Sequence, residues 1–400
     1  MTKKPILLIM GGAVLLLAGI MGIWATDVAY AAPLPDSPLF QDATEEPASA
    51  EQPAPAGEQE AMTQEEPTSA YCLLCHSQAG RVWELPSGEV LSLTIDPAML
   101  AGSVHGADNP EGPLECADCH TNHRFPHDPL PVQDTREFEL TRYATCRNCH
   151  EDQYTHLQDS VHGAAIRNGT LEAATCVDCH GGHNIQPPDE PRERISLTCG
   201  KCHGAIFDQY RTSVHGAALL SESNPDVPTC IDCHGVHDIQ NPMTSLFRVR
   251  SPQLCANCHA DTALMNKYNI STNVFDSYLT DFHGATVALF EQEDPNAATN
   301  KAVCYDCHGV HDIAAVNDDN SHVIRENLLE TCRQCHPSAS SDFPDSWVGH
   351  FPPTLESHPL LFLVNLFYKI LIPGVLSGFV LLIATDIFRR IRERLGLVRH

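Results

Sequence analysis

The chain has 400 residues, and it carries 18 cysteines and 23 histidines but only three tryptophans. Its formal net charge is −27, which excludes a nucleic acid partner because phosphate binding requires a basic surface. The cysteine and histidine content is also unusual for an ordinary globular core, so it indicates a chain filled by bound cofactors.

The N-terminus has the pattern of a secretory signal. Two lysines at positions 3 and 4 precede an apolar run from Ile6 to Trp24, and Ala29-Tyr30-Ala31 forms an A-x-A cleavage site. We therefore predict a signal peptide over residues 1–31 and a mature chain that begins at Ala32. The apolar run approaches the length of a membrane span, so an uncleaved anchor is the alternative.

Residues 32–70 are rich in Pro, Glu, Ala and Gln and contain few large apolar residues. Such a composition buries too little surface to offset the entropy lost when a chain becomes ordered. We predict an acidic, disordered tether here. An exported chain would normally use its cysteines in disulfides, but the cysteine spacing that follows indicates a different use.

Every cysteine lies in a C-x-x-C pair that histidine follows directly, and all of these pairs fall within residues 71–357. The nine sites are Cys72 and Cys75 with His76, Cys116 and Cys119 with His120, Cys146 and Cys149 with His150, Cys176 and Cys179 with His180, Cys199 and Cys202 with His203, Cys230 and Cys233 with His234, Cys255 and Cys258 with His259, Cys304 and Cys307 with His308, and Cys332 and Cys335 with His336. C-x-x-C-H is the attachment signature of c-type haem. Two thiols one turn apart add to the two vinyl groups of a porphyrin edge, and the next histidine reaches the iron from the same side.

Zinc, iron–sulfur and disulfide interpretations do not explain the repeated histidine. A zinc site needs only the cysteine pairs, and so do the other two kinds of site. We therefore predict nine covalently bound c-type haems in residues 71–357, with the nine motif histidines as proximal iron ligands.

Nine further histidines recur in repeated contexts. Four lie three residues after a motif histidine, four precede glycine in S-V-H-G or D-F-H-G segments, and one lies in the V-G-H segment after the last motif. Nine candidates for nine irons predict bis-histidine ligation throughout. The predicted distal ligands are His105, His123, His162, His183, His215, His237, His283, His311 and His350.

A histidine three residues after a motif is poorly placed to reach over its own haem, so we expect it to serve a neighbouring haem. The alternative, that these are surface or hydrogen-bonding histidines, is the usual one for a lone histidine. Methionine ligation raises the haem potential, and the four methionines beyond the signal lack a repeated context, which predicts low-potential haems. The remaining histidines have no repeated context and are interpreted as ordinary: His127, His156, His322, His358 and His400.

The motifs form a repeated two-haem unit, in which C-x-x-C-H is followed by a histidine-glycine and then by C-x-D-C-H-x-x-H. The repeats are unit 1 (72–123), unit 2 (146–183), unit 3 (199–237), unit 4 (255–311) and a half unit (332–350). Unit 1 departs slightly, because it reads CADCHTNH where the other units have glycine after the motif histidine.

The segments between motifs predict short helices. Glu151–Val161 and Ala205–Val214 have helical composition, and prolines near the second site of each unit break the chain. No strand-like alternation recurs. We expect a mainly α fold with extensive loops, in which an elongated multihaem cytochrome c body is built from two-haem units. Haems at this density must lie close enough for electrons to pass between them.

These doubled motifs resemble those of the periplasmic multihaem cytochromes c over residues 72–350. The resemblance implies a mostly helical carrier that accepts electrons at one end and releases them at the other. It implies no single pathway, because the motifs are specific for haem attachment alone.

The main alternative is a multihaem reductase of a small nitrogen or sulfur substrate with one open haem. Catalysis at a haem requires an iron with an open sixth position. Reductases that resemble this class often create it with a C-x-x-C-K site, and the sequence contains no such motif. Distal histidines also match the irons one for one. We therefore expect an electron-transfer protein and not an enzyme; a haem store or filament subunit is a further alternative.

The chain becomes apolar from Pro359, and Ile370–Phe388 fits a transmembrane helix. Five arginines follow within residues 389–400, as expected of a cytoplasmic end. We predict a membrane-proximal segment and a single span over residues 358–388, a cytoplasmic basic tail over 389–400, and a haem domain outside the cytoplasmic membrane. A buried core helix, the alternative, rarely ends in so many arginines.

The span itself contains no histidine between Ile370 and Phe388, so it cannot hold a haem inside the bilayer. Anchored cytochromes that resemble this one commonly receive electrons from a cytochrome b-type quinol-oxidising subunit, and we expect such a partner. Membrane lipid and redox partner proteins, including basic ones, are the other expected partners. The alternative is that the helix only raises the local concentration of the protein at the membrane.

Overall fold

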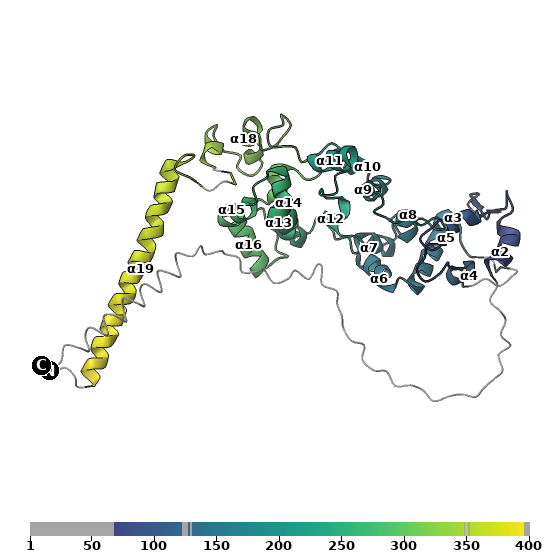
Figure 1. The fold of residues 1–400 in the computed structure, drawn as a ribbon, viewed down its shortest axis with the longest axis horizontal. Coiled ribbons are helices and arrows are strands. Elements are labelled where there is room, and N and C mark those ends of the chain that lie inside the picture. The colour runs from purple at the N-terminus through teal and green to yellow at the C-terminus, as the bar shows by residue number, and fades with distance from the viewer. Residues whose placement is uncertain (1–67, 122–126, 129, 348, 351–352, 396–400) are drawn as a thin grey trace. The chain divides into compact units, whose positions relative to one another are not determined.

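The computed structural model describes residues 68–121, 127–128, 130–347, 349–350 and 353–395. The predicted signal peptide and nearly all of the predicted tether lie outside these residues, and so does the end of the basic tail. The described part consists mainly of short helices joined by loops, as Figure 1 shows. The expected mainly α class with extensive loops is confirmed.

The helices and strands follow the units. Unit 1 and the loop after it contain α2 (Ser69–His76), β1 (Val82–Glu84), β2 (Val90–Ser92), α3 (Pro97–Ala101), α4 (Cys116–Cys119) and α5 (Thr135–Arg142). Unit 2 contains η1 (Tyr143–Asn148), α6 (Glu151–Asp159), α7 (Val161–Arg167) and α8 (Cys176–His180). Unit 3 contains α9 (Glu193–Gly200), α10 (Gly204–Tyr210), α11 (Val214–Glu222) and α12 (Cys230–His234). The rest comprises α13 (Ser245–His259), α14 (Thr262–Met265), η2 (Asn266–Tyr268), α15 (Val274–Thr280), α16 (Phe282–Glu293), α17 (Cys304–His308), α18 (Arg325–Arg333), η3 (Phe343–Ser346) and α19 (Pro359–Arg394).

The strands β1 and β2 form a two-stranded antiparallel hairpin in which Trp83 is opposite Leu91. Trp83 packs edge-on against Phe138 of α5, with ring centroids 6.2 Å apart. The hairpin therefore packs against the segment that leads into unit 2.

The two helices predicted from sequence are each interrupted by a serine. The predicted helix over Glu151–Val161 ends as α6, and Ser160 takes an extended conformation before α7 begins. The Ser160 hydroxyl accepts a hydrogen bond from the N–H of Gly163 at 3.2 Å, which caps α7. Ser213 makes the same cap between α10 and α11. Serine competes with helix continuation because its side chain satisfies the first free N–H groups of the next helix.

Few apolar side chains are fully buried among the described residues. The buried cluster consists of Val249 of α13, Val287 of α16 and Val303 before α17, with Tyr305 packed against it. A body of this size normally buries a much larger apolar core. Burial of protein against protein therefore supplies only part of what holds this chain together.

An ion pair joins the two motifs of a unit in units 2, 3 and 4. The aspartate of each C-x-D-C motif accepts from an arginine that precedes the first motif of the same unit, at 3.0 Å for Arg136–Asp178, 2.8 Å for Arg192–Asp232 and 2.7 Å for Arg248–Asp306. The same carboxylates also accept from the backbone N–H at the start of the motif helix, as Asp306 does from Val303 at 2.7 Å. The motif aspartate therefore caps its own helix and fixes the arginine.

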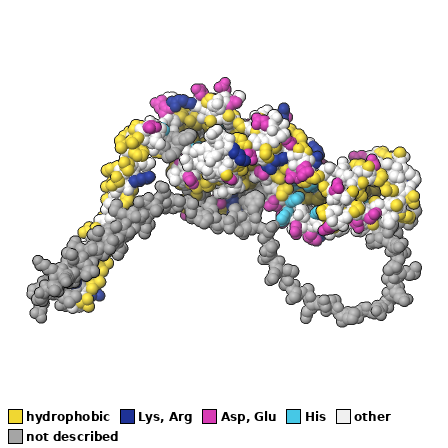
Figure 2. All heavy atoms as spheres, in the orientation of Figure 1, with side chains coloured by type: hydrophobic (Ala, Val, Ile, Leu, Met, Phe, Trp, Pro, Cys, Tyr) yellow, Lys and Arg dark blue, Asp and Glu magenta, His cyan; other side chains and the backbone are white. Residues whose placement is uncertain are grey.

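The C-terminal helix α19 runs without a break from Pro359 to Arg394, although Pro373 lies inside it. It is the one helix in the described residues long and apolar enough to span a membrane, and none of its apolar window is buried. At 1.5 Å per residue its 36 residues extend about 54 Å, which exceeds a hydrocarbon core of about 30 Å. Figure 2 shows hydrophobic side chains along the visible face of this helix, whereas acidic side chains are scattered over the other described elements. The predicted membrane-proximal segment is thus part of the same helix as the span.

Replacing Arg248 with glutamine should lower the free energy of unfolding by about 1–3 kcal/mol, because the partly buried Asp306 loses charged hydrogen bonds. Arg248 also donates to the Lys301 carbonyl at 2.8 Å, so the variant frees that segment as well. Thermal unfolding followed by circular dichroism measures the change. The control is Arg211→Gln, whose exposed pair with Asp208 should contribute less than about 1 kcal/mol. Equal losses in the two variants would contradict this role of Arg248.

Candidate haem-binding sites

Each attachment motif forms a single helical turn. In the second motif of units 2, 3 and 4 the turn is a complete short helix: α8, α12 and α17. In other motifs the histidine N–H donates to the carbonyl of the first cysteine, at 2.9 Å for His150 and His203 and 2.8 Å for His336. Residues three and four apart lie on the same face of a helix. The two thiols and the motif histidine therefore face the same side in every motif.

The motif histidines each lie beside one other histidine. Nine such ring pairs occur among the described residues, with centroids 6.0–6.3 Å apart and interplanar angles from 19° to 64°. The pairs are His76–His127, His150–His105, His120–His183, His203–His162, His180–His237, His259–His215, His234–His311, His336–His283 and His308–His350. Each motif histidine occurs once, and so does each partner.

This spacing fits two imidazoles on one haem iron. An imidazole nitrogen binds a transition metal at about 2 Å, and its ring centre lies about 1 Å behind that nitrogen, so two axial rings on one iron have centres about 6 Å apart. Ordinary aromatic pairs spread over about 4.5–7 Å between centroids, so the narrow spacing across all nine pairs is what favours a shared metal. Within the described residues no three His, Cys, Asp or Glu side chains converge to hold a metal ion by themselves. The residues therefore fit a metal whose other ligands come from a porphyrin.

The glycine after a distal histidine lets the backbone approach closely. A Cβ atom on Gly216 would lie 1.9 Å from the carbonyl oxygen of Tyr210, and one on Gly284 would lie 2.1 Å from that of Tyr278. Gly106 and Gly163 meet carbonyl oxygens at 2.3 Å in the same way. The histidine-glycine pair is thus a packing requirement that fixes where the imidazole starts.

A second glycine turns the chain after the motif histidine. Gly181, Gly235 and Gly309 have φ of 78°, 82° and 83°, and each closes its motif helix by donating to the carbonyl four residues earlier. Side chains other than glycine rarely adopt this conformation. The turn directs the histidine three residues beyond the motif away from its own motif and toward a different unit.

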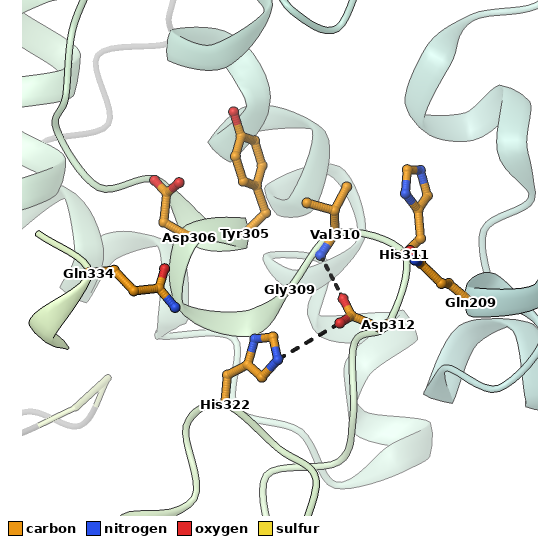
Figure 3. Close-up of a pocket in the computed structure, with 9 residues that line it drawn as sticks. All are labelled: Gln209, Tyr305, Asp306, Gly309, Val310, His311, Asp312, His322 and Gln334. Atoms are coloured by element: carbon orange, nitrogen blue, oxygen red, sulfur yellow. Dashed lines mark hydrogen bonds and ion pairs between the residues drawn. The ribbon is translucent and has the colours of Figure 1, made fainter. Parts of the chain in front are cut away.

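Figure 3 shows one of these turns, at an open hollow of about 480 Å³ beside α17. Asp312 accepts from the Val310 N–H at 3.2 Å and faces the Nε2 atom of His322 at 3.8 Å. These contacts fix the loop that carries His311. His322, which lies outside every repeated sequence context, therefore supports the loop of a distal histidine.

Burial keeps most of the paired imidazoles neutral. Burial, and to a lesser extent the neighbouring His259, lowers the pKa of His215 to about 4. Burial also lowers the pKa of His234 and His308. His283 differs, because a hydrogen bond to Asp281 raises its pKa. A neutral ring keeps one nitrogen lone pair free for a metal, so the buried pairs need no deprotonation before binding iron.

The cysteine thiols of successive motifs lie beside one another. The pKa values of Cys176, Cys199 and Cys255 are raised, first by a contact with the first thiol of the other motif in the same unit and then by burial. In each unit, the second thiol of the second motif is close to the next unit, as Cys179 is to Cys202. The attachment points therefore form a continuous row along the described chain.

Cys75, Cys149 and Cys335 are the second cysteines of the first motif in unit 1, in unit 2 and in the half unit. The side chains of Cys149 and Cys335 are exposed, and that of Cys75 is only partly buried. Cys149 raises the pKa of Cys119, and Cys335 raises that of Cys307, so both face the last motif of the preceding unit.

Residues 1–71 contain no cysteine, so they offer Cys75 no thiol of an earlier motif. The sequence gives all eighteen cysteines the same role, and Cys119, Cys179 and Cys202 are exposed in the same way as Cys149 and Cys335. The thioether links of all eighteen cysteines remain a prediction from the motif spacing. An exposed thiol is accessible to a vinyl group, so the exposure of Cys149 and Cys335 is compatible with that prediction.

Eight of the nine predicted distal histidines lie beside a motif histidine. The ninth, His123, lies outside the described residues, and the ring beside His76 belongs to His127. His127 lies outside every repeated context, so the repeat pattern did not identify it. The one signal in the sequence was the departure of unit 1 from the repeat at Thr121. The arginine partners of the motif aspartates were also missed, since they lie 40–58 residues away in sequence.

Comparison with known proteins agrees with this geometry. The model of the cytochrome c3 family matches residues 172–260, a stretch that contains four attachment motifs. The multiheme cytochrome MtrA of Shewanella baltica is 25% identical over 286 residues, which cover 59% of this chain and 75% of MtrA. The cytochrome c-type protein NrfB of Escherichia coli is 23% identical over 142 residues, which cover 32% of this chain and 70% of NrfB. The chain is a multihaem cytochrome of the c type.

Replacing Gly216 with alanine should displace His215 from His259, because the added Cβ would overlap the Tyr210 carbonyl oxygen. We expect one haem to change from low to high spin, measured by electron paramagnetic resonance of the oxidised protein. The control is Gly204→Ala, which also changes a glycine directly after a paired histidine but meets no atom within 4 Å. A low-spin Gly216→Ala protein would show that the close approach does not position His215.

Proposed function

We propose that this protein is a membrane-anchored electron conduit with nine covalently bound, bis-histidine c-type haems. The observation that supports it most directly is the set of nine histidine pairs at 6.0–6.3 Å, one for every attachment motif. The eighteen cysteines form the thioether links, and the motif histidines bind iron on the proximal side. Eight distal ligands are those of the sequence prediction; the partner of His76 is treated below.

Haem iron, when bound, supplies a one-electron centre that cycles between the ferrous and ferric states. The chain's own residues then determine what such a centre can do. The two histidines paired at each motif would hold the iron from both sides, which would leave no position for a substrate. This favours electron transfer over the alternative of a reductase with one open haem.

The row of thiols supports transfer along the chain. Because each thiol binds the edge of a porphyrin, adjoining thiols bring the edges of successive cofactors close together. Contacts within a unit, such as Cys199 with Cys230, alternate with contacts between units, such as Cys179 with Cys202. The proposed path therefore continues from the first motif to the last without a missing step.

The domain boundaries and the topology remain those predicted from the sequence. A signal peptide (1–31) and a tether (32–70) would precede the haem domain (71–357), which lies on the periplasmic or extracellular side. The helix α19 would cross the cytoplasmic membrane with its arginines inside. Its N-terminal end follows the last motif closely in sequence, so the haem at Cys332 and Cys335 is held near the membrane.

A cytochrome b-type quinol-oxidising subunit is the partner that best fits this arrangement. The span has no histidine that could ligate a haem in the bilayer, so electrons from quinol need another membrane protein to reach the last motif. The excess of acidic over basic residues in the chain would favour basic partners at the other end of the path.

Replacing His237 with alanine should leave nine haems attached and change one of them to high spin, because His180 loses the imidazole paired with it. Intact mass counts the haems, with nine haem increments expected on a chain from Ala32, and electron paramagnetic resonance measures the spin state. His358→Ala is the control, since His358 lies at the start of α19 and is not one of the nine pairs. Eight haems in the mature protein, or an unchanged spectrum of His237→Ala, would contradict the proposal.

Purification in mild detergent through a tag after His400 should recover a protein with b-type haem together with this chain. Menaquinol should then reduce the c-type haems of the complex faster than those of a soluble variant that ends before Pro359. The reason is that only the anchored chain can meet a quinol-oxidising partner in the bilayer. A chain that purifies without b-type haem, and that quinol reduces no faster than the soluble variant, would leave α19 as a tether alone.

A further inference from the structure

Eight of the nine histidine pairs follow one rule, which is that they join two different units. The histidine before glycine in one unit lies beside the first motif histidine of the next, as His215 of unit 3 lies beside His259 of unit 4. The histidine after the second motif lies beside the second motif histidine of the preceding unit, as His311 does with His234. Two distal histidines therefore cross at every junction between units.

A backbone hydrogen bond accompanies each of the first three crossings. The residue before the histidine-glycine donates to the isoleucine two residues after the crossing histidine, at 2.8 Å for Val104–Ile185, 2.9 Å for Val161–Ile239 and 2.8 Å for Val214–Ile313. The two crossing segments are thus held together directly. A histidine three residues after a motif reaches its partner only where a preceding unit offers this contact.

Residues 1–71 contain neither histidine nor cysteine. They therefore offer no histidine-glycine to serve His76 and no second motif to receive His123. Four junctions with two crossing histidines each supply eight distal ligands. The ninth ligand, for the haem at Cys72 and Cys75, must come from outside the rule.

The turn that would direct His123 is also missing from unit 1. Thr121 occupies the place of Gly181, Gly235 and Gly309, and it is not among the residues with positive φ. The motif helix α4 ends at Cys119, one residue earlier than its counterparts. Threonine in the glycine conformation would cost about 1–3 kcal/mol. Unit 1 therefore lacks the glycine that makes this turn in the other units.

His127 lies where the missing ligand is needed. Its ring centroid is 6.1 Å from that of His76, within the range of the other eight pairs. The Nδ1 atom of His76 donates to the Leu93 carbonyl at 2.8 Å, which leaves Nε2 as the nitrogen with a lone pair for iron. We infer that His127, and not His123, is the sixth ligand of the first haem, and that His123 binds no iron. This inference rests on the proposed bis-histidine ligation.

With this assignment, the first haem differs from the other eight in where its two histidine ligands come from. Both axial ligands of the first haem come from one unit and the loop that follows it, so this haem closes the series without linking two units. Loss of its distal ligand should open one iron and leave the four junctions intact.

The test uses the full-length protein with its haems attached. His127→Ala should change one haem in nine to high spin, and added imidazole should restore the low-spin signal. His123→Ala should remain low spin throughout. A high-spin haem in His123→Ala with none in His127→Ala would overturn the assignment, and so would two variants that are both fully low spin.

A second pair of variants avoids dependence on an open iron. His127→Met keeps a ligand, and because methionine ligation raises the potential, one haem in nine should become easier to reduce in a redox titration. His123→Met should titrate like the unaltered protein; the reverse result would overturn the inference. A high-spin haem in the unaltered protein would count against the all-bis-histidine proposal itself, which separates that failure from failure of the His127 assignment.

Discussion

Crossed pairing of histidines is the constraint on which the rest of this structure depends. In the proposed ligation, an iron between two imidazoles would require two segments of the chain to meet at a fixed separation, and eight of the nine histidine pairs in the described residues join different units. His183 must reach back to His120, and His105 must reach forward to His150. No unit can complete its own sites, so neighbouring units become interdependent. This is the relation between repeats in a solenoid, with ligand bonds in place of a shared apolar core.

The small protein core follows from the same constraint. Val249, Val287 and Val303 form a buried cluster, but most large apolar side chains near the motifs remain partly exposed. The proposed covalent attachment would hold each cofactor without requiring a deep pocket, so a short chain would suffice for each one. Local polar contacts then position the backbone. The motif aspartates cap their helices and bind arginines such as Arg248, while serine caps such as Ser213 start the helices that carry distal histidines.

The first unit and the last half unit show how the pattern of histidine pairs changes where no further unit adjoins in this sequence. At the C-terminal end, His350 of the half unit lies beside His308, as the histidine after the second motif does in units 2 to 4 with the preceding unit. At the N-terminal end, the position beside His76 is filled by His127 from the loop after unit 1. Terminal repeats are atypical in repeat proteins because they lack a neighbour on one side. Here unit 1 differs in that the histidine beside His76 comes from the loop after the unit. In the sequence, Thr121 in place of glycine indicates this difference.

The sequence alone determined the features that depend on short spacing. C-x-x-C-H places two thiols and an imidazole on one helical turn, and the repeated contexts singled out eight histidines that lie beside motif histidines. The apolar stretch after Pro359 predicted α19, although not its full length, because only the continuous helix shows that Pro373 does not break it. The tertiary structure decided which histidine lies beside which, placed His127 at His76, and brought Arg248 to Asp306. These pairs are separated by 51 and 58 residues, and their approach depends on how the units fold against one another, which local propensity does not encode.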